Sequence, residues 1–281
     1  MKSSQRLLGV ALALLAIFQH ATAAIPSAGF ASVTIEPEIT AIAAGKPFTV
    51  GVHVKLNAGW HTYWQFAGDS GLPPKITWHL PEGFKAGPIQ WPLPEARLDE
   101  PDLLSFVYPE EAFLLVEITP PEQLPTSEVT LRAKVWCIAV GRMGDVEAPN
   151  AELKIPTIGE PRPAEAELFA KWRARLPKSE PPPFQVRWER SAATEFSLQI
   201  SGLAAEDKVE FFPLPAGAAK PGHPTVSAPG SDGTRTIITP ITEAPAANLP
   251  WSGVVVVRKP GAERVGWAVA STGAILQTSP N

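Results

Sequence analysis

The sequence predicts a mainly β protein: an antiparallel β-sandwich followed by a linker helix and a second, smaller β domain. Short runs in which apolar and polar residues alternate recur along most of the 281 residues, and this alternation is typical of half-buried strands. The 32 prolines are about twice the usual share of roughly 5%. Most prolines stand in clusters between the alternating runs, where a missing N–H does least harm, so long central helices are not expected.

Residues 1–23 are expected to be a signal peptide. Lys2 and Arg6 precede an apolar run from Leu7 to Phe18, and Ala21-Thr22-Ala23 has the pattern of a cleavage site. The apolar run is shorter than the roughly 20 residues needed to cross a bilayer. The sequence therefore predicts export to the periplasm and no membrane-spanning segment after the signal peptide is removed.

The first folded domain is expected at residues 30–158. Turn sequences such as Gly71-Leu72-Pro73-Pro74 separate its alternating runs. The expected strands are Ser32–Glu36, Phe48–Leu56, Trp60–Trp64, Ile76–Leu80, Phe113–Ile118, Val129–Val140 and Glu152–Ile155. A domain of this size can bury a sufficient apolar core without a disulfide.

Residues 159–183 are expected to link this domain to the next one. Apolar residues at helical spacing between Pro163 and Pro177 predict one amphipathic helix over Ala164–Leu176, and Pro181–Pro183 should be extended and stiff. The second β domain is expected at residues 184–275. Its expected strands are Phe184–Glu189, Phe196–Ile200, Val209–Phe212, Thr236–Ile241, Val254–Arg258 and Val265–Ala270.

Composition excludes several functional classes. The net charge of -4 gives no electrostatic reason to expect nucleic acid or a membrane surface as partner. The sequence has no Cys-x-x-Cys, His-x-His or Met-rich cluster, so no metal site and no cofactor are expected. It also has no G-x-S-x-G motif and no phosphate-binding glycine loop, which leaves hydrolase or kinase chemistry unsupported.

A long block of sequence carries a family resemblance. GWHTYWQFAGDSGLPPKITWHLPEGF, from Gly59 to Phe84, is followed by GPIQWPLPE, from Gly87 to Glu95. Together with LLVEITPP, ELFAKWRARLP and VEFFP further on, these residues resemble the N-terminal domain of the thiol:disulfide interchange protein DsbD and its exported relatives. The resemblance implies an immunoglobulin-like sandwich that passes electrons from a membrane-embedded partner to periplasmic thiol proteins, in disulfide isomerisation and cytochrome c maturation.

The redox dithiol of that family is incomplete in this chain. The resemblance implies two cysteines separated by three to five residues after the strand at Leu131–Val140, but KVWCIAVGRMGDVEAPNAEL contains only Cys137, and Val146 or Glu147 stands where the second cysteine is expected. A dithiol relay needs a second thiolate to resolve its mixed disulfide. A lone cysteine would leave the partner covalently trapped.

Two interpretations of Cys137 remain open. Its position is in phase with Leu131, Val135 and Ala139, which predicts a buried and inert thiol on the core face of the strand. Alternatively, Cys137 is an exposed catalytic nucleophile whose pKa is lowered by Arg142 or Lys134.

The resemblance also implies a loop that covers the active site until a partner arrives. The matching residues, expected to bind the partner, are Asp99, Glu100, Pro101, Asp102, Leu103, Phe106 and Tyr108. They keep the acidic opening of the loop but not its aromatic-glycine centre. Their carboxylates lack the ligand spacing and glycine of a calcium loop, which favours a solvated acidic turn.

A second candidate surface is aromatic. Trp60, His61, Tyr63 and Trp64 lie in one expected strand, so alternate residues should face the core and the surface. Packing in the core explains most of these rings. The set that faces solvent remains a candidate for binding a glycan or a peptide.

The leading hypothesis is a periplasmic partner-binding or scaffolding module of a thiol-disulfide, cytochrome c maturation or envelope system that has lost the redox dithiol. One alternative is a protein-disulfide reductase component that works through Cys137 with a thiol from another chain. The other alternative is a glycan- or peptide-binding module. Periplasmic or membrane thiol-redox proteins are the expected partners.

Overall fold

The computed structural model describes residues 30–99, 102–124, 126–141, 144–147, 150–192, 194–243 and 250–271. Within these ranges the chain forms 20 strands and one short helix, which confirms the predicted mainly β fold. The helix they contain is neither long nor apolar enough to cross a bilayer. The signal peptide expected at residues 1–23 lies outside the described ranges.

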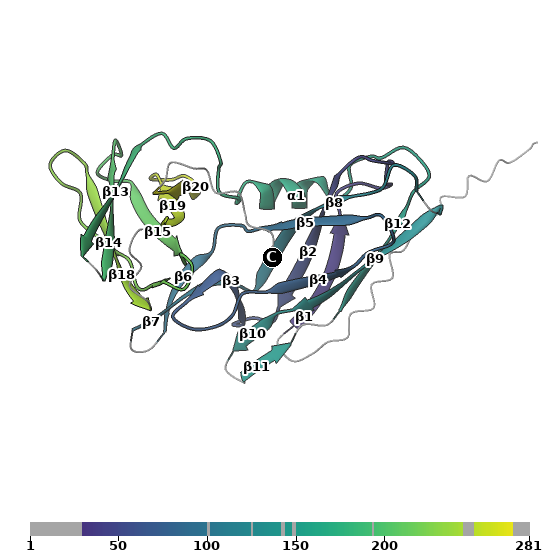
Figure 1. The fold of residues 1–281 in the computed structure, drawn as a ribbon, viewed down its shortest axis with the longest axis horizontal. Coiled ribbons are helices and arrows are strands. Elements are labelled where there is room, and N and C mark those ends of the chain that lie inside the picture. The colour runs from purple at the N-terminus through teal and green to yellow at the C-terminus, as the bar shows by residue number, and fades with distance from the viewer. Residues whose placement is uncertain are drawn as a thin grey trace, which may run out of the picture.

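The first unit holds three antiparallel sheets (Figure 1). One has the order β1 (Phe30–Pro37), β2 (Phe48–Leu56), β8 (Glu111–Thr119), β5 (Lys85–Gln90). The next has the order β11 (Gly144–Glu147), β10 (Ile138–Gly141), β3 (His61–Gly68), β7 (Leu103–Pro109), β6 (Glu95–Asp99). The third has the order β12 (Ala151–Pro156), β9 (Glu128–Trp136), β4 (Lys75–His79).

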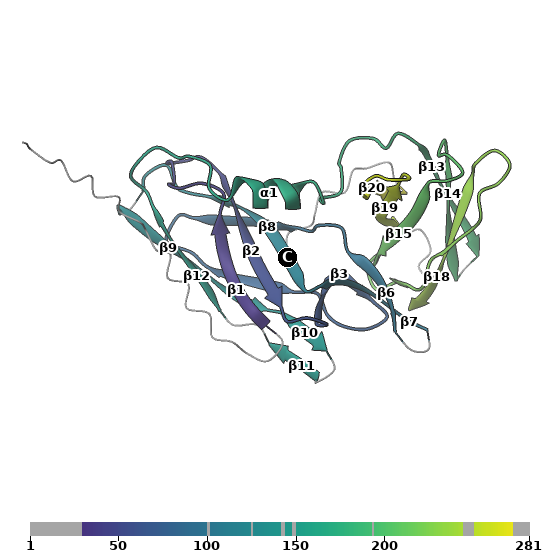
Figure 2. The same ribbon diagram turned by 180° about the vertical axis from the view of Figure 1, so that it is seen from behind.

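The core of the first unit lies between these sheets. Alternate residues of the strands point inward, as in Val50, Val52 and Val54 of β2, each 0% exposed. Helix α1 (Ala166–Arg173) lies over the outer face of β2 and β8 (Figure 2). The helix side chains Phe169 and Trp172 pack there against Phe113 and Leu115 of β8. The predicted linker helix is therefore present, and it seals the first unit.

Four strands of the first unit, β5, β6, β7 and β11, were not predicted. β5 contains Gly87 and Pro88, which broke the alternating pattern. β7 covers much of the stretch from Asp99 to Tyr108 that the resemblance implied to be a loop, and β6 ends at the first residue of that stretch. The long strand predicted at Val129–Val140 is in fact two strands, β9 and β10, which belong to different sheets.

The second unit packs two further sheets around its own core. The first runs β13 (Gln185–Ala192), β14 (Glu195–Ser201), β18 (Arg235–Glu243), β16 (Lys220–Pro221), with β17 (Thr225–Val226) also pairing with β18. The other runs β15 (Lys208–Leu214), β19 (Ser252–Arg258), β20 (Val265–Ala270). Phe196 and Trp251 stack at the centre of this core, with ring centroids 4.5 Å apart.

The two units share apolar contacts. Phe212 of β15 belongs to the core of the first unit and lies edge-on to Phe106 and Trp64, with ring centroids 5.1 and 5.9 Å away. Val254 and Val256 of β19 join the same core. An interface built from buried side chains fixes the relative position of two domains more firmly than a polar one does.

The segment Pro92–Pro94 ties this junction together. The Tyr108 hydroxyl donates to the carbonyl of Pro92 at 2.6 Å, and the Leu93 N–H donates to the carbonyl of Arg175, after the helix, at 2.8 Å. The Arg264 guanidinium, from the second unit, donates to the carbonyl of Pro94 at 2.9 Å. Three consecutive residues thus contact the first unit, the linker and the second unit.

Candidate functional site

Cys137 lies where the chain passes from one sheet to another. β9 pairs with β4 and β12, whereas β10 pairs with β3 and β11. The Cys137 side chain is 0% exposed and belongs to the core of the first unit. The strand phase predicted this orientation, because Val135 and Ala139, two residues before and after, point to the same side and are also buried.

The environment of Cys137 disfavours the thiolate. Its Sγ lies 2.9 Å from the Oγ1 of Thr62 on β3. Burial raises the pKa of the Cys137 thiol from 9.0 to about 12, and the hydrogen bond with Thr62 only partly opposes this effect. Because the thiolate is the form that attacks a disulfide, the sulfur is a neutral and enclosed group at physiological pH.

The acidic residues singled out in the sequence lie at the end of the β6–β7 hairpin. Asp99 closes β6 opposite Leu103, the first residue of β7. The Nε of Arg97 donates to both carboxylate oxygens of Asp99, at 2.9 and 3.1 Å. Asp102 is exposed, and Glu100 and Pro101 lie outside the described residues.

Two leucines make this end of the hairpin apolar as well as acidic. Leu98 is 60% exposed and Leu103 is 38% exposed. The set formed by Leu98, Asp99, Asp102 and Leu103 is called the hairpin tip below. β6 is the last strand of its sheet, and its residues from Glu95 to Leu98 are exposed, so its outer edge faces solvent.

The two aromatic members of the predicted partner-binding stretch are not at the surface. Phe106 and Tyr108 are each 2% exposed, because β7 is a central strand of its sheet and both residues point into the core. The expectation that they belong to a surface loop is therefore wrong. Phe106 packs at the junction with the second unit, and Tyr108 holds Pro92.

A neighbouring loop braces the hairpin. The Asp69 N–H donates to the carbonyl of Leu104, and the Leu104 N–H donates to the Asp69 carboxylate, both at 2.8 Å. Gly71, with a φ of 95°, allows this loop to lie against the Tyr63 ring, since a Cβ there would come within 2.2 Å of the ring. The β7 end of the hairpin is therefore held by paired hydrogen bonds.

The predicted aromatic surface does not form. Trp64 is 0% exposed, but His61 and Tyr63 on the opposite face of β3 are also buried, at 4% and 5% exposed. Tyr63 is covered by the loop at Gly71, and the Nδ1 of His61 lies 3.1 Å from the Arg97 guanidinium. Only Trp60 of the four is half-buried, so the expectation of one solvent-facing set was wrong.

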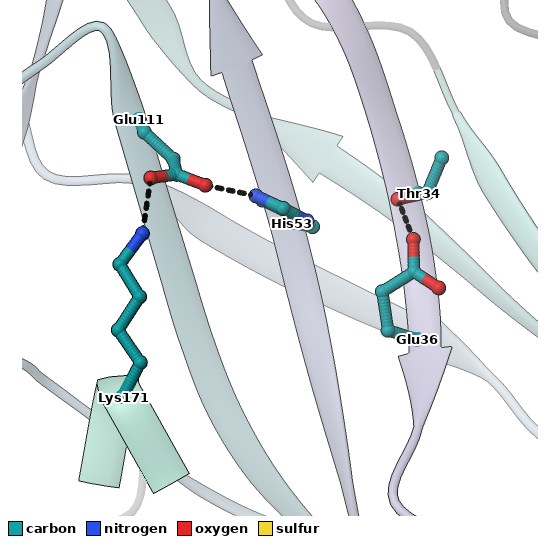
Figure 3. A network of polar contacts seen from close by, with 5 residues as sticks. All are labelled: Thr34, Glu36, His53, Glu111 and Lys171. Carbon is teal, nitrogen blue, oxygen red and sulfur yellow. Dashed lines mark hydrogen bonds and ion pairs between the residues drawn. The ribbon is translucent and has the colours of Figure 1, made fainter. Parts of the chain in front are cut away.

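A polar network that the sequence did not single out lies beneath the helix. Figure 3 shows the Glu111 carboxylate between two partners, the Nε2 of His53 at 2.7 Å and the Nζ of Lys171 of α1 at 3.1 Å. Burial lowers the pKa of His53, and the hydrogen bond with Glu111 only partly offsets this effect. Burial opposes ionisation of Glu111, but His53 and Lys171 outweigh it and hold its pKa below the usual value.

These contacts attach the helix to the sheet, and we assign them a structural role because the side chains of the network are engaged with one another. The Arg173 guanidinium adds an ion pair with Glu38 and a hydrogen bond to Thr49 at 2.8 Å. Among the described residues, no three His, Cys, Asp or Glu side chains gather closely enough to hold a metal ion. Of the predicted partner-binding residues that the structure describes, Asp99, Asp102 and Leu103 remain at the surface.

The sequence model of the family described as "Thiol:disulfide interchange protein DsbD, N-terminal" matches residues 32–137 of this chain. Among solved structures, the N-terminal periplasmic domain of ScsB from Proteus mirabilis aligns with a TM-score of 0.60 and 15% identity, over 85% of this chain and 90% of that chain. This alignment extends beyond the first unit and shows a shared fold.

Some other solved structures resemble this chain only weakly. The Actinomyces fimbrial adhesin FimA aligns with a TM-score of only 0.24 and 10% identity, over 85% of this chain and 96% of that chain. No curated protein matched the chain in the sequence comparison.

Proposed function

Because residues 32–137 match the sequence model of the DsbD N-terminal family, we propose that the chain is a periplasmic binding module of a thiol-disulfide interchange system that has no redox cycle of its own. The module binds a thiol-redox partner through the hairpin tip. The observation that carries this proposal is the state of Cys137, the single cysteine of the sequence, whose Sγ is enclosed in the core.

The chemistry of exchange explains why this observation is decisive. Thiol-disulfide exchange begins with a thiolate that reaches a disulfide sulfur in line, so the nucleophile needs both exposure and a low pKa. Cys137 is 0% exposed, and its pKa is raised to about 12. A reductase that works through Cys137 with a thiol from another chain would have to open the core first.

The hairpin tip supports the binding role. Its leucines place apolar surface at the end of an open edge strand, and a partner can add a strand to such an edge. The exposed carboxylate of Asp102, next to Leu103 in the chain, would favour a partner with a basic residue near its contact surface, whereas Asp99 is already paired with Arg97. The paired hydrogen bonds between Asp69 and Leu104 hold the base of the hairpin in place before binding.

The direct test measures binding and turnover in the same preparation. The chain is titrated with purified thioredoxin-fold periplasmic oxidoreductases by calorimetry, and insulin reduction is followed in parallel. We expect binding that Cys137→Ser leaves unchanged and that the pair Leu98→Ser with Leu103→Ser abolishes. Ile158→Ser is the matched control, because Ile158 is 70% exposed and lies outside the hairpin.

Two results would contradict the proposal. Catalytic disulfide reduction that disappears in Cys137→Ser would establish a redox enzyme. Binding that is lost equally in the leucine pair and in the Ile158 control would remove the hairpin tip as the contact surface.

A further inference from the structure

The outer face of the β12-β9-β4 sheet is basic in a chain whose total charge is negative. The inward residues of β9 are buried, so its polar residues all point outward. The outward residues of the three strands are Lys75, Thr77, His79, Glu128, Thr130, Arg132, Lys134, Trp136, Glu152 and Lys154. The set is called the basic face below.

Strand pairing concentrates the cations at one side of this face. Thr77 lies opposite Lys134, and His79 lies opposite Arg132. Lys75 lies opposite Trp136, and its Nζ is 5.8 Å from the centre of the Trp136 ring. Side chains directly opposite on paired strands are about 5 Å apart, so these cations form one continuous patch.

The cations of the basic face, Lys75, Arg132, Lys134 and Lys154, outnumber its carboxylates, Glu128 and Glu152, by four to two. Glu152 is committed to Arg132, with 3.2 Å between Oε2 and Nε. Lys75, Lys134 and Lys154 are exposed and, among the described residues, have no carboxylate within ion-pair distance. The whole chain carries 24 Lys and Arg against 28 Asp and Glu. The net charge therefore conceals a local positive surface.

We infer that the basic face binds an anionic lipid surface. A three-stranded sheet offers a flat array of cations, which complements an extended plane of negative charge. Trp136, half-buried at one end of the array, is the residue type that settles at the boundary between lipid headgroups and acyl chains. Each lysine near such a surface contributes about fivefold to the partition coefficient.

This contact would leave the hairpin tip unoccupied. The basic face belongs to the β12-β9-β4 sheet, whereas the tip ends the β11-β10-β3-β7-β6 sheet. The inference does not depend on the proposed function, and variants of the two surfaces separate the two ideas.

The test is co-sedimentation of the chain, without the expected signal peptide, with vesicles. One set contains equal parts of phosphatidylglycerol and phosphatidylcholine, and the other contains phosphatidylcholine alone. We expect binding to the anionic vesicles at low salt, no binding to the neutral vesicles, and release at high salt because mobile ions screen the surface charges. The triple variant Lys75→Gln, Lys134→Gln and Lys154→Gln should bind about a hundredfold more weakly.

Matched controls keep the result interpretable. Lys46→Gln, Lys208→Gln and Lys259→Gln change the net charge equally at exposed lysines outside the face, and should retain binding. A Lys→Arg triple at the basic face should also retain it, which separates lost charge from lost folding. Equal loss in both Gln triples, binding to neutral vesicles, absence of binding at low salt, or salt-sensitive self-association through this face in sedimentation velocity would each overturn the inference.

Discussion

Gly266 of β20 gives Leu93 of the first unit just enough room. A Cβ at Gly266 would lie 2.4 Å from the Cδ2 of Leu93 and 3.0 Å from the Cγ1 of Val254. The backbone beside it is also engaged, because the Lys178 N–H donates to the carbonyl of Gly266 at 2.8 Å. The contact between the two units therefore depends on the absence of one side chain.

Gly266→Ala should destabilise the chain by about 1–3 kcal/mol, because the added methyl group overpacks the junction. Leu93→Ala alone should cost about 2–5 kcal/mol by leaving a cavity. The double variant should cost less than the sum, since the smaller side chain makes room for the methyl group. Urea unfolding measures all three, and strict additivity would show that the two positions do not touch in solution.

Trp172→Ala should be among the most damaging changes in the helix. Trp172 is 0% exposed and stacks on Phe113 with ring centroids 5.9 Å apart, so its removal should cost about 3–5 kcal/mol. Trp172→Phe should cost much less, because the buried indole Nε1 has no hydrogen-bond partner within the part of the chain that the structure describes. If Trp172→Phe and Trp172→Ala lower the free energy of unfolding in urea by similar amounts, the indole N–H has a hydrogen-bond partner in solution.

Acid should weaken the chain through His53. Its pKa is lowered in the folded state, so below the usual value near 6.5 the unfolded chain takes up a proton that the folded chain resists. His53 contributes its full share to the free energy of unfolding above about pH 6.5. This contribution falls as the pH drops toward the lowered pKa of the folded state. His53→Gln should reduce the loss of unfolding free energy between neutral pH and roughly pH 5. An acid-induced loss of the same size in the parent chain and in His53→Gln would contradict this assignment.

Alkali should weaken the chain through Cys137. The folded pKa of about 12 lies above the value of 9.0 for a free thiol, so the folded state keeps the proton that the unfolded state releases. Its contribution is complete below pH 9.0 and is lost as the pH rises toward about 12. Cys137→Ala should flatten this dependence. Rapid alkylation of the native protein by iodoacetamide at neutral pH would contradict the enclosed thiol.

The period-two pattern located most strands because it records burial on one face. β2 and β20 have the predicted bounds, and the orientation of Cys137 followed from its phase with the buried residues of β9 and β10. The same reasoning failed for His61 and Tyr63, since a strand pattern does not reveal that a loop will cover the second face. It also missed the β6 strand, whose residues from Glu95 to Leu98 are all exposed at a sheet edge.

The candidate surfaces divide in the same way. The family resemblance singled out Asp99 and Leu103, but the burial of Phe106 depends on contact with Phe212, more than a hundred residues away. The lysines of the basic face could have been found from the sequence. Lys134 and Lys154 occupy polar positions of the predicted strands Val129–Val140 and Glu152–Ile155, and Lys75 directly precedes the predicted strand Ile76–Leu80. What the sequence lacked was the pairing that places these strands side by side.

The aromatic triangle of Trp64, Phe106 and Phe212 limits how the chain can be divided. A truncation that ends at residue 158 would remove Phe212 and so expose the aromatic rings of Trp64 and Phe106 to solvent. An exposed apolar patch of this kind promotes association with other chains. Such a fragment should aggregate during purification. In the full chain, proteolytic cleavage of the linker should leave two fragments that remain associated and migrate together in a native gel.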